Sequence, residues 1–563
     1  MFKHQVLVIG GGLAGLRAAV ESADSLDTAV LSLLYPIRSH SGAAQGGMNA
    51  ALANADPDDS PERHAYDTVK GSDFLADQDA SLAMTMDAPA RIYELDHWGC
   101  PWSRMPDGRI AQRPFGGAGY PRTCFGADRT GHYILQTVNE QSVKRGVKVY
   151  NEWAALSLIV YNGVCKGVVA MNMHTGDVEA FYADATIMAT GGLGRIYART
   201  SNAMVCTGYG MAIAFWAGVP LKDMEFIQFH PTSMVGTNIL VSEAARGEGG
   251  YLINNQGERF MTHYVSESVM ELAPRDIVSR SIQTEINEGR GIDGGVYLDL
   301  RHLGREKILE RLPGIRELAM NFQGVDPIHE PIRVQPGQHY AMGGIDTDKD
   351  GASRLPGFYA AGECACVNVH GANRLGGNSL LETVVFGKRA GEAATRYVSG
   401  LNGRPNPEVA VAEALQATRG RVDTMLKSEG KERMAQIRDE MAITMSDKVG
   451  VFRQPDLLVD AVETIRRLKD RYENIGLDHK GRRFNLDLLR TLELGGMLDL
   501  AETIAVGAMN RTESRGSHAR RDFTKRDDEN WLKHTLATWT PDGPKLSYST
   551  VTITKWQPEE RKY

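Results

Sequence analysis

A glycine-rich turn and a histidine near the start of the chain have the residue types and spacing of a nucleotide site. Gly10, Gly12 and Gly15 form a Gly-x-Gly-x-x-Gly pattern. His40 lies 25 positions after Gly15, between an arginine and the small-residue loop 41–47. Glycine lets the backbone approach a pyrophosphate, and a helix that begins there directs its N–H groups at the phosphates. The pattern predicts a bound dinucleotide, and the position of His40 predicts a flavin tethered through its imidazole.

The elements that must position this turn are also visible in the sequence. Residues 6–9 form a continuous apolar run, as expected of a strand buried on both faces, and residues 16–21 read as a helix. This strand–glycine–helix context favours a binding site over a glycine-rich turn without a ligand. The second strand, 28–31, ends in Ser32, where an acidic residue normally binds the ribose hydroxyls. Ser32 can make one hydrogen bond, but the departure argues against a plain NAD site.

Two later segments are typical of strands that return to the same cofactor. Residues 185–192 form an apolar run that ends in small residues. Residues 357–363 form a similar run that ends in an acidic residue, Glu363. Either segment alone could be an ordinary core strand. Both are similar to segments of flavoproteins with two dinucleotide folds, and together with the first turn they favour FAD.

Beyond these segments, the chain resembles the flavoprotein subunits of succinate dehydrogenase and fumarate reductase (complex II) from residue 5 to residue 535. The resemblance implies that His40 carries an 8α bond to FAD. An electron-withdrawing substituent there raises the reduction potential of the flavin, which suits a weak reductant such as succinate. The resemblance rests on the motifs RSHSGAAQGG, QRPFGG, QFHPT, RGEGGYL, APRD, HYAMGG, HGANRLGGNSLLE and RDDENWLKHT.

The resemblance also implies an α/β fold: a discontinuous Rossmann-like FAD-binding domain, an inserted α+β capping domain, a C-terminal helical bundle and a small C-terminal domain. The chain departs from the family at Tyr209, which stands where an aspartate usually contacts FAD, and we therefore leave Tyr209 out of the expected site. The expected cofactor-binding residues are Gly10, Gly11, Gly12, Ala14, Gly15, Ser32, Arg38, Ser39, His40, Ser41, Ala44, Gln45, Gly46, Gly47, Thr190, Gly191, Glu363, Asn378, Ser379 and Leu380.

The substrate implied by the resemblance is a C4 dicarboxylate, which needs cations and donors at both ends. His230, His339 and Arg374 match the carboxylate ligands of the family. Arg374 can bind a carboxylate through two N–H groups. Ser242 keeps a hydroxyl where threonine is usual, and Phe115 matches an aromatic residue that crowds the dicarboxylate. Any one of these histidines alone is more often an interior residue than a ligand; their joint match favours ligands.

The catalytic proton is assigned by the resemblance to Arg275. A guanidinium is effectively never neutral, so Arg275 must act as a relay that passes one proton on as it accepts another. Glu243 and Arg246 are the expected next links towards solvent. In the reverse direction Arg275 is the acid. The alternative is a structural salt bridge between Arg275 and Asp276 or another acid.

Composition limits the class of protein. A chain of 563 residues with 42% hydrophobic and 24% charged residues predicts a globular protein of two to four domains. The net charge of −7 and the lack of a basic stripe argue against nucleic acid. No apolar run approaches the length of a membrane span, so we expect membrane association only through a partner. Residues 1–4 lead directly into the first strand, so no targeting peptide is expected.

The cysteines bear on the route of the electrons. They form no CxxC pair and no iron–sulfur spacing, so we expect no metal site and reduced thiols in the cytosol. Any iron–sulfur clusters must then lie on another polypeptide. The implied partners are an iron–sulfur subunit and, through it, a membrane anchor with quinone, which would place the chain at the cytoplasmic face of a bacterial inner membrane. The six cysteines are Cys100, Cys124, Cys165, Cys206, Cys364 and Cys366.

Four domains are expected. The FAD-binding domain should comprise 1–235 and 340–400, with 236–339 as the capping domain. The helical domain should span 401–510 and the C-terminal domain 511–563. A cap that closes over the dicarboxylate would expel water and position the relay.

The C-terminal third carries its own signals. Residues 400–407 read as a linker, and 408–473 and 486–510 have helical patterns with few glycines. Residues 511–533 are dense in charges of both signs, which is usually a solvated face, with a partner interface as the alternative. Residues 547–554 alternate polar and β-branched types, which predicts a terminal strand or hairpin.

Three alternatives to a covalently flavinylated succinate dehydrogenase subunit stay open. A fumarate reductase would run the same site in reverse. An L-aspartate oxidase shares the fold and the arginine but binds FAD without a tether, so His40 argues against it. A flavin-binding scaffold without a substrate would have no use for a set of carboxylate ligands.

Overall fold

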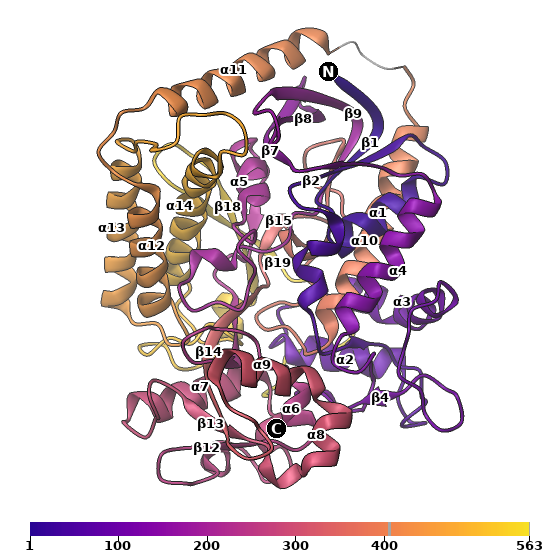
Figure 1. Ribbon diagram of the computed structural model, residues 1–563, viewed down its shortest axis with the longest axis vertical. Coiled ribbons are helices and arrows are strands. Elements are labelled where there is room, and N and C mark those ends of the chain that lie inside the picture. The colour runs from indigo at the N-terminus through magenta and orange to yellow at the C-terminus, as the bar shows by residue number, and fades with distance from the viewer. Residues whose placement is uncertain (404–406, 562–563) are drawn as a thin grey trace.

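The fold is organised around a seven-stranded sheet (Figure 1). The computed structural model describes residues 1–403 and 407–561. Strands β6, β2, β1, β9 and β16 are parallel to one another. On the other side of β9, β8 pairs antiparallel with β9, and β7 pairs antiparallel with β8. Residues 6–9 are almost completely buried, as the apolar run predicts. The strands are β1 (Phe2–Ile9), β2 (Thr28–Ser32), β6 (Lys148–Asn151), β7 (Trp153–Tyr161), β8 (Val164–Asn172), β9 (Val178–Met188) and β16 (Phe358–Ala360).

Helices α1 (Leu13–Ser22) and α10 (Asn378–Ser399) pack closely against one another beside this sheet. Two glycines of α10 make the approach possible. A Cβ atom at Gly387 would lie 2.6 Å from the carbonyl oxygen of Ala14, and one at Gly391 would lie 2.6 Å from that of Ala18. A larger residue at either position would separate the helices and displace the glycine-rich turn that precedes α1.

A smaller lobe extends from two long strands, β11 (Ile227–Met234) and β14 (Ile332–Ala341), that pair antiparallel. It forms the lower part of the molecule in Figure 1. Its own apolar core is drawn from residues between Met234 and Val334. Its elements are α6 (Ala244–Gly247), β12 (Tyr251–Ile253), α7 (Arg275–Asn287), β13 (Val296–Asp299), α8 (Arg305–Arg311) and α9 (Pro313–Gln323).

The helical pattern of the C-terminal third is confirmed. Helices α12, α13 and α14 pack on one another, and α11 lies across the β7 and β9 end of the sheet (Figure 1). The expected linker 400–407 lies partly outside the described residues. The helices are α11 (Glu408–Lys427), α12 (Met434–Lys448), α13 (Pro455–Tyr472) and α14 (Leu486–Asn510). No helix of the described chain is long and apolar enough to cross a membrane.

The remaining elements complete the body. A three-stranded sheet and a five-stranded sheet lie outside the central one. The expected terminal hairpin is present as β18 and β19, although β19 ends at Thr550. These elements are β3 (Met48–Asn49), α2 (Pro61–Gly71), α3 (Gln78–His97), β4 (Gln112–Arg113), β5 (Thr123–Cys124), α4 (Thr130–Lys144), α5 (Tyr209–Trp216), β10 (Leu221–Lys222), β15 (Gly344–Asp346), β17 (Ala365–Cys366), α15 (Asp528–Trp531), β18 (Lys533–Thr538) and β19 (Lys545–Thr550).

The prediction of a solvated face for residues 511–533 is wrong for its first half. Arg511, Glu513 and Arg515 are at most 1% exposed. Arg511 Nε lies 2.8 Å from Glu225 Oε1 and its Nη1 lies 3.0 Å from Glu513 Oε1, which also lies 2.8 Å from Arg515 Nε. The charges are buried because each is paired, and Glu225, the partner that draws the segment inward, is remote in the sequence.

Residues 552–561 form a C-terminal strap along α2 and the start of α3. The side chain of Gln78 accepts hydrogen bonds from the backbone N–H groups of residues 554–556. At the end of the strap, Arg561 Nη2 lies 2.7 Å from Asp276 Oδ2 and 3.2 Å from Asp73 Oδ2. Asp276 belongs to α7 of the smaller lobe, so the strap joins that lobe to the main body.

Arg511→Met should lower the free energy of unfolding by about 3–5 kcal/mol, because Glu225 and Glu513 would stay buried without their shared cation. Arg333→Met is the matched control, since Arg333 and its partner Asp293 are 39% and 70% exposed. The control should cost about 1 kcal/mol or less. Urea denaturation of both variants measures the difference, and equal losses would contradict the buried network.

Candidate active site

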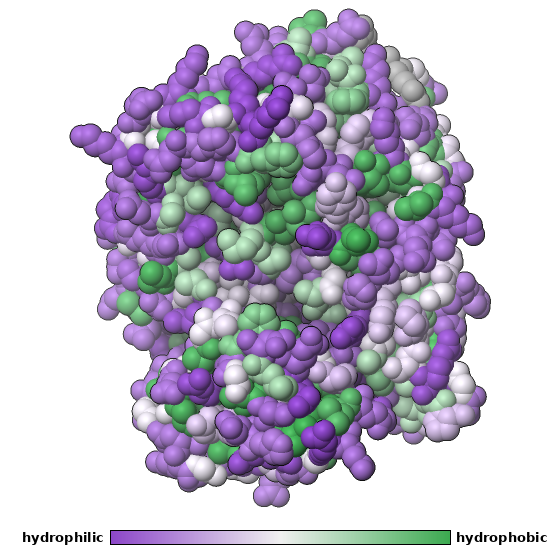
Figure 2. Space-filling model, viewed as in Figure 1, coloured by the Kyte–Doolittle hydropathy of each residue, from purple (hydrophilic) through white to green (hydrophobic). Residues whose placement is uncertain are grey.

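A cavity of about 870 Å³ lies between the sheet, α10 and the smaller lobe. Figure 2 shows the molecular surface hollowed between the upper body and the lower lobe. The wall combines glycine-rich backbone with the charged residues expected to bind a dicarboxylate. The expected residues that line it are Gly10, Gly11, Gly12, Ala14, Ser32, Ser39, His40, Ser41, Ala44, Gln45, Gly46, Gly47, Phe115, Thr190, Gly191, His230, Ser242, Glu243, Arg275, His339, Glu363, Arg374, Ser379 and Leu380.

Four expected site residues do not line the cavity. Arg38 is exposed on the surface. Gly15 lies beneath the turn, where a Cβ atom would be 2.0 Å from the carbonyl oxygen of Gly10, so it serves packing. Asn378 turns away, and its Oδ1 accepts from Asn49 at 2.8 Å. Arg246 is buried behind Glu243, with Nη2 3.8 Å from Glu243 Oε2, and does not reach solvent.

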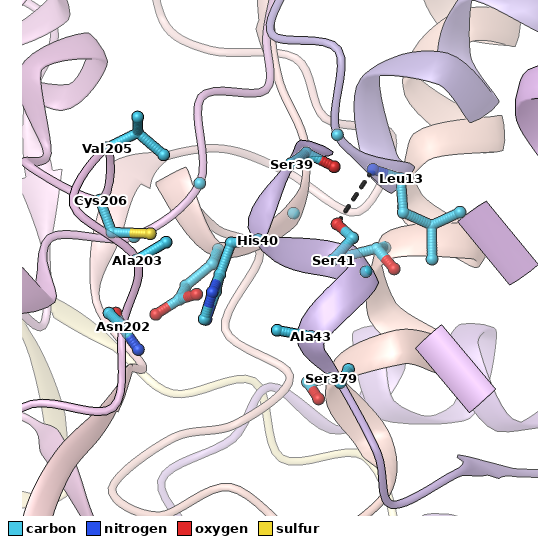
Figure 3. A pocket seen from close by; sticks show the side chains of 18 of the residues that line it. Leu13, Ser39, His40, Ser41, Ala43, Asn202, Ala203, Val205, Cys206 and Ser379 are labelled. Atoms are coloured by element: carbon cyan, nitrogen blue, oxygen red, sulfur yellow. Dashed lines mark hydrogen bonds between the residues drawn. The ribbon is translucent and has the colours of Figure 1, made fainter. Parts of the chain in front are cut away.

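At the nucleotide end of the cavity, side-chain hydrogen bonds fix the backbone of the glycine-rich turn. Gly11 N–H donates to Ser32 Oγ at 3.2 Å. Leu13 N–H donates to Ser41 Oγ at 3.1 Å, the hydrogen bond that Figure 3 marks with a dashed line. On the same wall, Ser39 Oγ and Gln45 Oε1 are buried without a partner in the described structure. Buried polar groups are normally hydrogen-bonded, so these two atoms fit a polar ligand such as a flavin nucleotide.

His40 lies in the turn η2 (His40–Ala43), and Figure 3 shows its imidazole directed across the cavity towards the segment with Asn202 and Cys206. Burial, and then the positive charge of Arg195, lower the pKa of His40 to about 4. The imidazole is therefore neutral near pH 7, and a neutral ring has a nitrogen lone pair available for bonding.

Glu363 follows β16, and its carboxyl group lies against Gly192. Its Oε1 accepts a hydrogen bond from Ala341 N–H at 3.0 Å. Burial raises the pKa of Glu363 to about 8, so the carboxyl group is mostly protonated near pH 7. A carboxyl group accepts hydrogen bonds from hydroxyl groups and, when it is protonated, can also donate one, so Glu363 fits the hydroxyl groups of a nucleotide.

At the other end, His230 and His339 bring their rings to within 5.0 Å between centroids. His230 Nδ1 accepts from the backbone N–H of Thr232 at 3.2 Å, which leaves the proton of the neutral ring on Nε2. Burial, and then the charge of Arg275, hold the pKa of both histidines well below 6.5. Neutral rings can donate one hydrogen bond each to a carboxylate.

Two buried arginines lie beside these histidines. Arg275, at the start of α7, places Nε 2.7 Å and Nη2 2.6 Å from Glu243 Oε2. Burial raises the pKa of Glu243, but Arg275 and Arg246 more than offset this and keep it below the usual value, so the pair is ionised. Gln228 Oε1 accepts from both Arg275 Nη1, at 3.1 Å, and Arg374 Nη2, at 3.0 Å. Asp276, the alternative partner of Arg275, pairs with Arg280 and Arg561 instead.

Phe115 and Ser242 lie on the same wall, next to the flavin-loop backbone. A Cβ atom at Gly46 would lie 2.8 Å from Phe115 Cζ and 3.9 Å from Ser242 Oγ. A larger residue at position 46 would therefore collide with the tip of the Phe115 ring.

The sequence did not reveal the contribution of three side chains and one segment. Gln228 and Tyr340 lie inside the quoted motifs QFHPT and HYAMGG, so the signal was present, but their side chains were assigned no role. Tyr209 was excluded, yet it lines the cavity, and its hydroxyl accepts from Arg421 Nη2 at 3.3 Å. The segment 201–207, which also lines the cavity, has no recognisable motif.

Comparison with known families agrees with this geometry. Residues 5–380 match the family model described as FAD binding domain, and residues 438–563 match the model described as Fumarate reductase flavoprotein C-term. Together with the cavity, these matches define an FAD-dependent oxidoreductase. More narrowly, the chain belongs to the succinate dehydrogenase/fumarate reductase flavoprotein family.

Relatives named fumarate reductase and relatives named succinate dehydrogenase are both similar to the chain. The fumarate reductase flavoprotein subunit of Mycobacterium tuberculosis is 47% identical, over 100% of this chain and 99% of that protein. The succinate dehydrogenase flavoprotein subunit of Rickettsia bellii is 45% identical, over 98% and 96%. A structure of Escherichia coli quinol fumarate reductase superposes with a TM-score of 0.96 at 42% identity, covering 99% of this chain and 98% of that one.

Glu363→Gln should change how stability depends on pH in the flavin-free protein. The carboxyl binds a proton up to about pH 8 when folded but only up to about 4.5 when unfolded, so its contribution declines as pH rises between these values. The slope is about 1.4 kcal/mol per pH unit at most. Denaturation at pH 5, 6.5 and 8 should show a flatter profile for Glu363→Gln than for the wild type. Glu392→Gln, at a partly exposed position of α10 where the carboxylate pairs with Lys388, should leave the profile nearly unchanged.

Proposed function

We propose that this chain is the flavoprotein subunit of a succinate:quinone oxidoreductase, which oxidises succinate to fumarate and transfers the electrons to an iron–sulfur subunit. The observation that carries the proposal is the convergence of His230, His339, Arg275 and Arg374 at one end of a cavity whose other end fits FAD. Two cations and two neutral N–H donors match the two carboxylates of a C4 dicarboxylate. Bound FAD supplies the two-electron acceptor for the hydride that leaves the substrate.

The substrate would lie between two groups of ligands. Arg374 and His339 can bind one carboxylate, because Arg374 offers parallel N–H groups and His339 a neutral ring. His230 Nε2–H and the hydroxyl of Ser242 can donate to the other. Phe115 would pack on the carbon chain and exclude water from it, which strengthens every electrostatic contact in the site.

The proton that accompanies the hydride would be taken by Arg275. Its contact with Glu243 provides a base that accepts a proton as the guanidinium receives one, so Arg275 is never left neutral. Arg246 lies 3.8 Å beyond Glu243 and is fully buried, so the exit to solvent must continue past it. Arg246 Nη1 donates to the carbonyl oxygen of Glu271, whose carboxylate binds the partly exposed Arg259.

We also propose a covalent bond between His40 and the 8α position of FAD. The neutral imidazole and its orientation into the cavity support it. The partners proposed are an iron–sulfur subunit and, through it, a membrane anchor with quinone, which would hold the chain at the cytoplasmic face of a bacterial inner membrane. Solved structures named for quinol–fumarate reductase and for a Mycobacterium smegmatis Sdh1 complex with UQ1 are similar to the chain over 99% of its length.

A second candidate function is quinol:fumarate reduction, since several of the similar relatives carry that name. The same site serves both directions, with Arg275 as the acid in the reverse one. Rates with succinate and an oxidising acceptor, compared with rates with fumarate and a reduced donor, distinguish the two. Activity with L-aspartate in place of succinate would instead indicate an oxidase of the related, untethered type.

Arg275→Lys should leave the flavin content unchanged and lower succinate turnover by roughly 10²–10⁴, because an ammonium group cannot span Glu243 and the substrate as the guanidinium does. Steady-state assays normalised to bound flavin measure the effect. Arg280→Lys, five residues further along α7, is the matched control and should retain most activity. Full turnover by Arg275→Lys would contradict the assignment.

His40→Ser should abolish the covalent bond while FAD still binds non-covalently through the glycine turn. Acid precipitation followed by a denaturing gel should show flavin fluorescence in the wild-type band and none in the variant band. Co-expression with the partner subunits guards against incomplete attachment. A fluorescent His40→Ser band, or a wild-type band without flavin, would rule out His40 as the attachment site.

A further inference from the structure

Arg374 is a buried cation that the structure stabilises without an ion pair. It is 2% exposed, and no carboxylate in the described parts of the chain forms an ion pair with it, whereas Arg275 pairs with Glu243. Its hydrogen bonds are those from Nη2 to Gln228 and, at 3.4 Å, from Nη1 to the carbonyl oxygen of Leu375. Its Nε–H has no partner. Most of the five N–H donors of this guanidinium are therefore unused.

The face of an aromatic ring takes the place of a counter-ion. The guanidinium carbon of Arg374 lies 4.5 Å from the ring centroid of Tyr340. Both residues line the cavity, and Tyr340 follows His339 in β14. A ring face attracts a cation through its quadrupole, and the attraction is stronger where water is excluded.

The ring of Tyr340 is fixed from its far end. Its hydroxyl donates to Glu382 Oε2, and the same oxygen lies 3.0 Å from His370 Nε2. The His370 ring meets the Tyr340 ring edge-on, with 5.4 Å between centroids. All three side chains are buried. A phenol that donates to a carboxylate has more electron density in its ring, so Glu382 both orients Tyr340 and makes its face more attractive to a cation.

We propose that Tyr340, held by Glu382 and His370, is a positioning residue that stabilises Arg374 through the ring face and so keeps its N–H donors free for a substrate carboxylate. The inference rests on the proposed function in that it takes the ligand to be a dicarboxylate. A protein carboxylate in the place of the ring would neutralise Arg374 and occupy the donors that the substrate needs. The Tyr340 ring instead stabilises the positive charge of Arg374 without accepting a hydrogen bond from any of its N–H groups.

The test compares Tyr340→Phe, which keeps the ring, with Tyr340→Leu, which removes it. Malonate, a small dicarboxylate, is titrated against the flavin-loaded protein, and its Kd is read from the change in flavin absorbance. The malonate-induced rise in Tm of flavin-free protein is a second readout. We expect Tyr340→Phe to bind within about threefold of the wild type and Tyr340→Leu to bind at least tenfold more weakly. Tyr359→Leu is the matched control, since Tyr359 is a buried tyrosine outside the cavity, and its Kd should equal that of the wild type.

The outcomes separate the possible failures. If Tyr340→Leu binds malonate as tightly as the wild type, or if Tyr340→Phe binds as weakly as Tyr340→Leu, the role of the ring face is refuted. If the wild type binds no dicarboxylate, the proposed function itself fails. Should Tyr340→Leu not fold, phenylalanine, 4-fluorophenylalanine and 3,4,5-trifluorophenylalanine at position 340 decide the matter, because fluorine weakens the ring face at nearly constant shape. Affinity should then decline with each added fluorine, and a constant affinity would overturn the proposal.

Discussion

The site depends on one amide oxygen that two guanidinium groups share. Arg275 and Arg374 both donate to Gln228 Oε1, and the amide nitrogen of Gln228 is itself fixed by Asn373 Oδ1 at 2.9 Å and by the carbonyl oxygen of Arg374 at 2.8 Å. Two like charges in a buried site repel one another, and the pKa of Arg374 falls to about 9 because of its burial and the charge of Arg275. Around Gln228, two guanidinium groups thus lie beside the paired carboxylate of Glu243, and this local positive charge favours an anionic ligand.

The two long strands β11 and β14 supply uncharged partners to these two arginines. They carry His230, His339, Gln228 and Tyr340, and they are also the strands from which the smaller lobe extends. The hydrogen-bonded pairing of the two strands fixes the histidines relative to one another. Arg275 arrives from the lobe itself, at the first residue of α7. Residues of the strand pair and of the smaller lobe therefore meet in one cavity.

The sequence predicts the features that depend on local spacing and misses those that depend on contacts between distant segments. Local patterns predict the turn 10–15, the strands that lead to Ser32 and Glu363, and the helices after residue 407. Asn378 belongs to a quoted motif, but hydrogen bonds to Asn49, His64 and Thr68 turn its side chain away from the cavity. Likewise, the charge-dense segment is buried by Glu225, which no local pattern connects to it. The division of the chain into four domains stays a prediction, although the smaller lobe does have its own apolar core.

The C-terminal strap has a consequence for how freely the smaller lobe can move. One guanidinium group, that of Arg561, contacts both Asp276, the neighbour of Arg275, and Asp73 of the main body. Both aspartates are buried, so salt screens these ion pairs less than it would at the surface. Any movement of α7 away from the main body must therefore break a largely buried ionic contact.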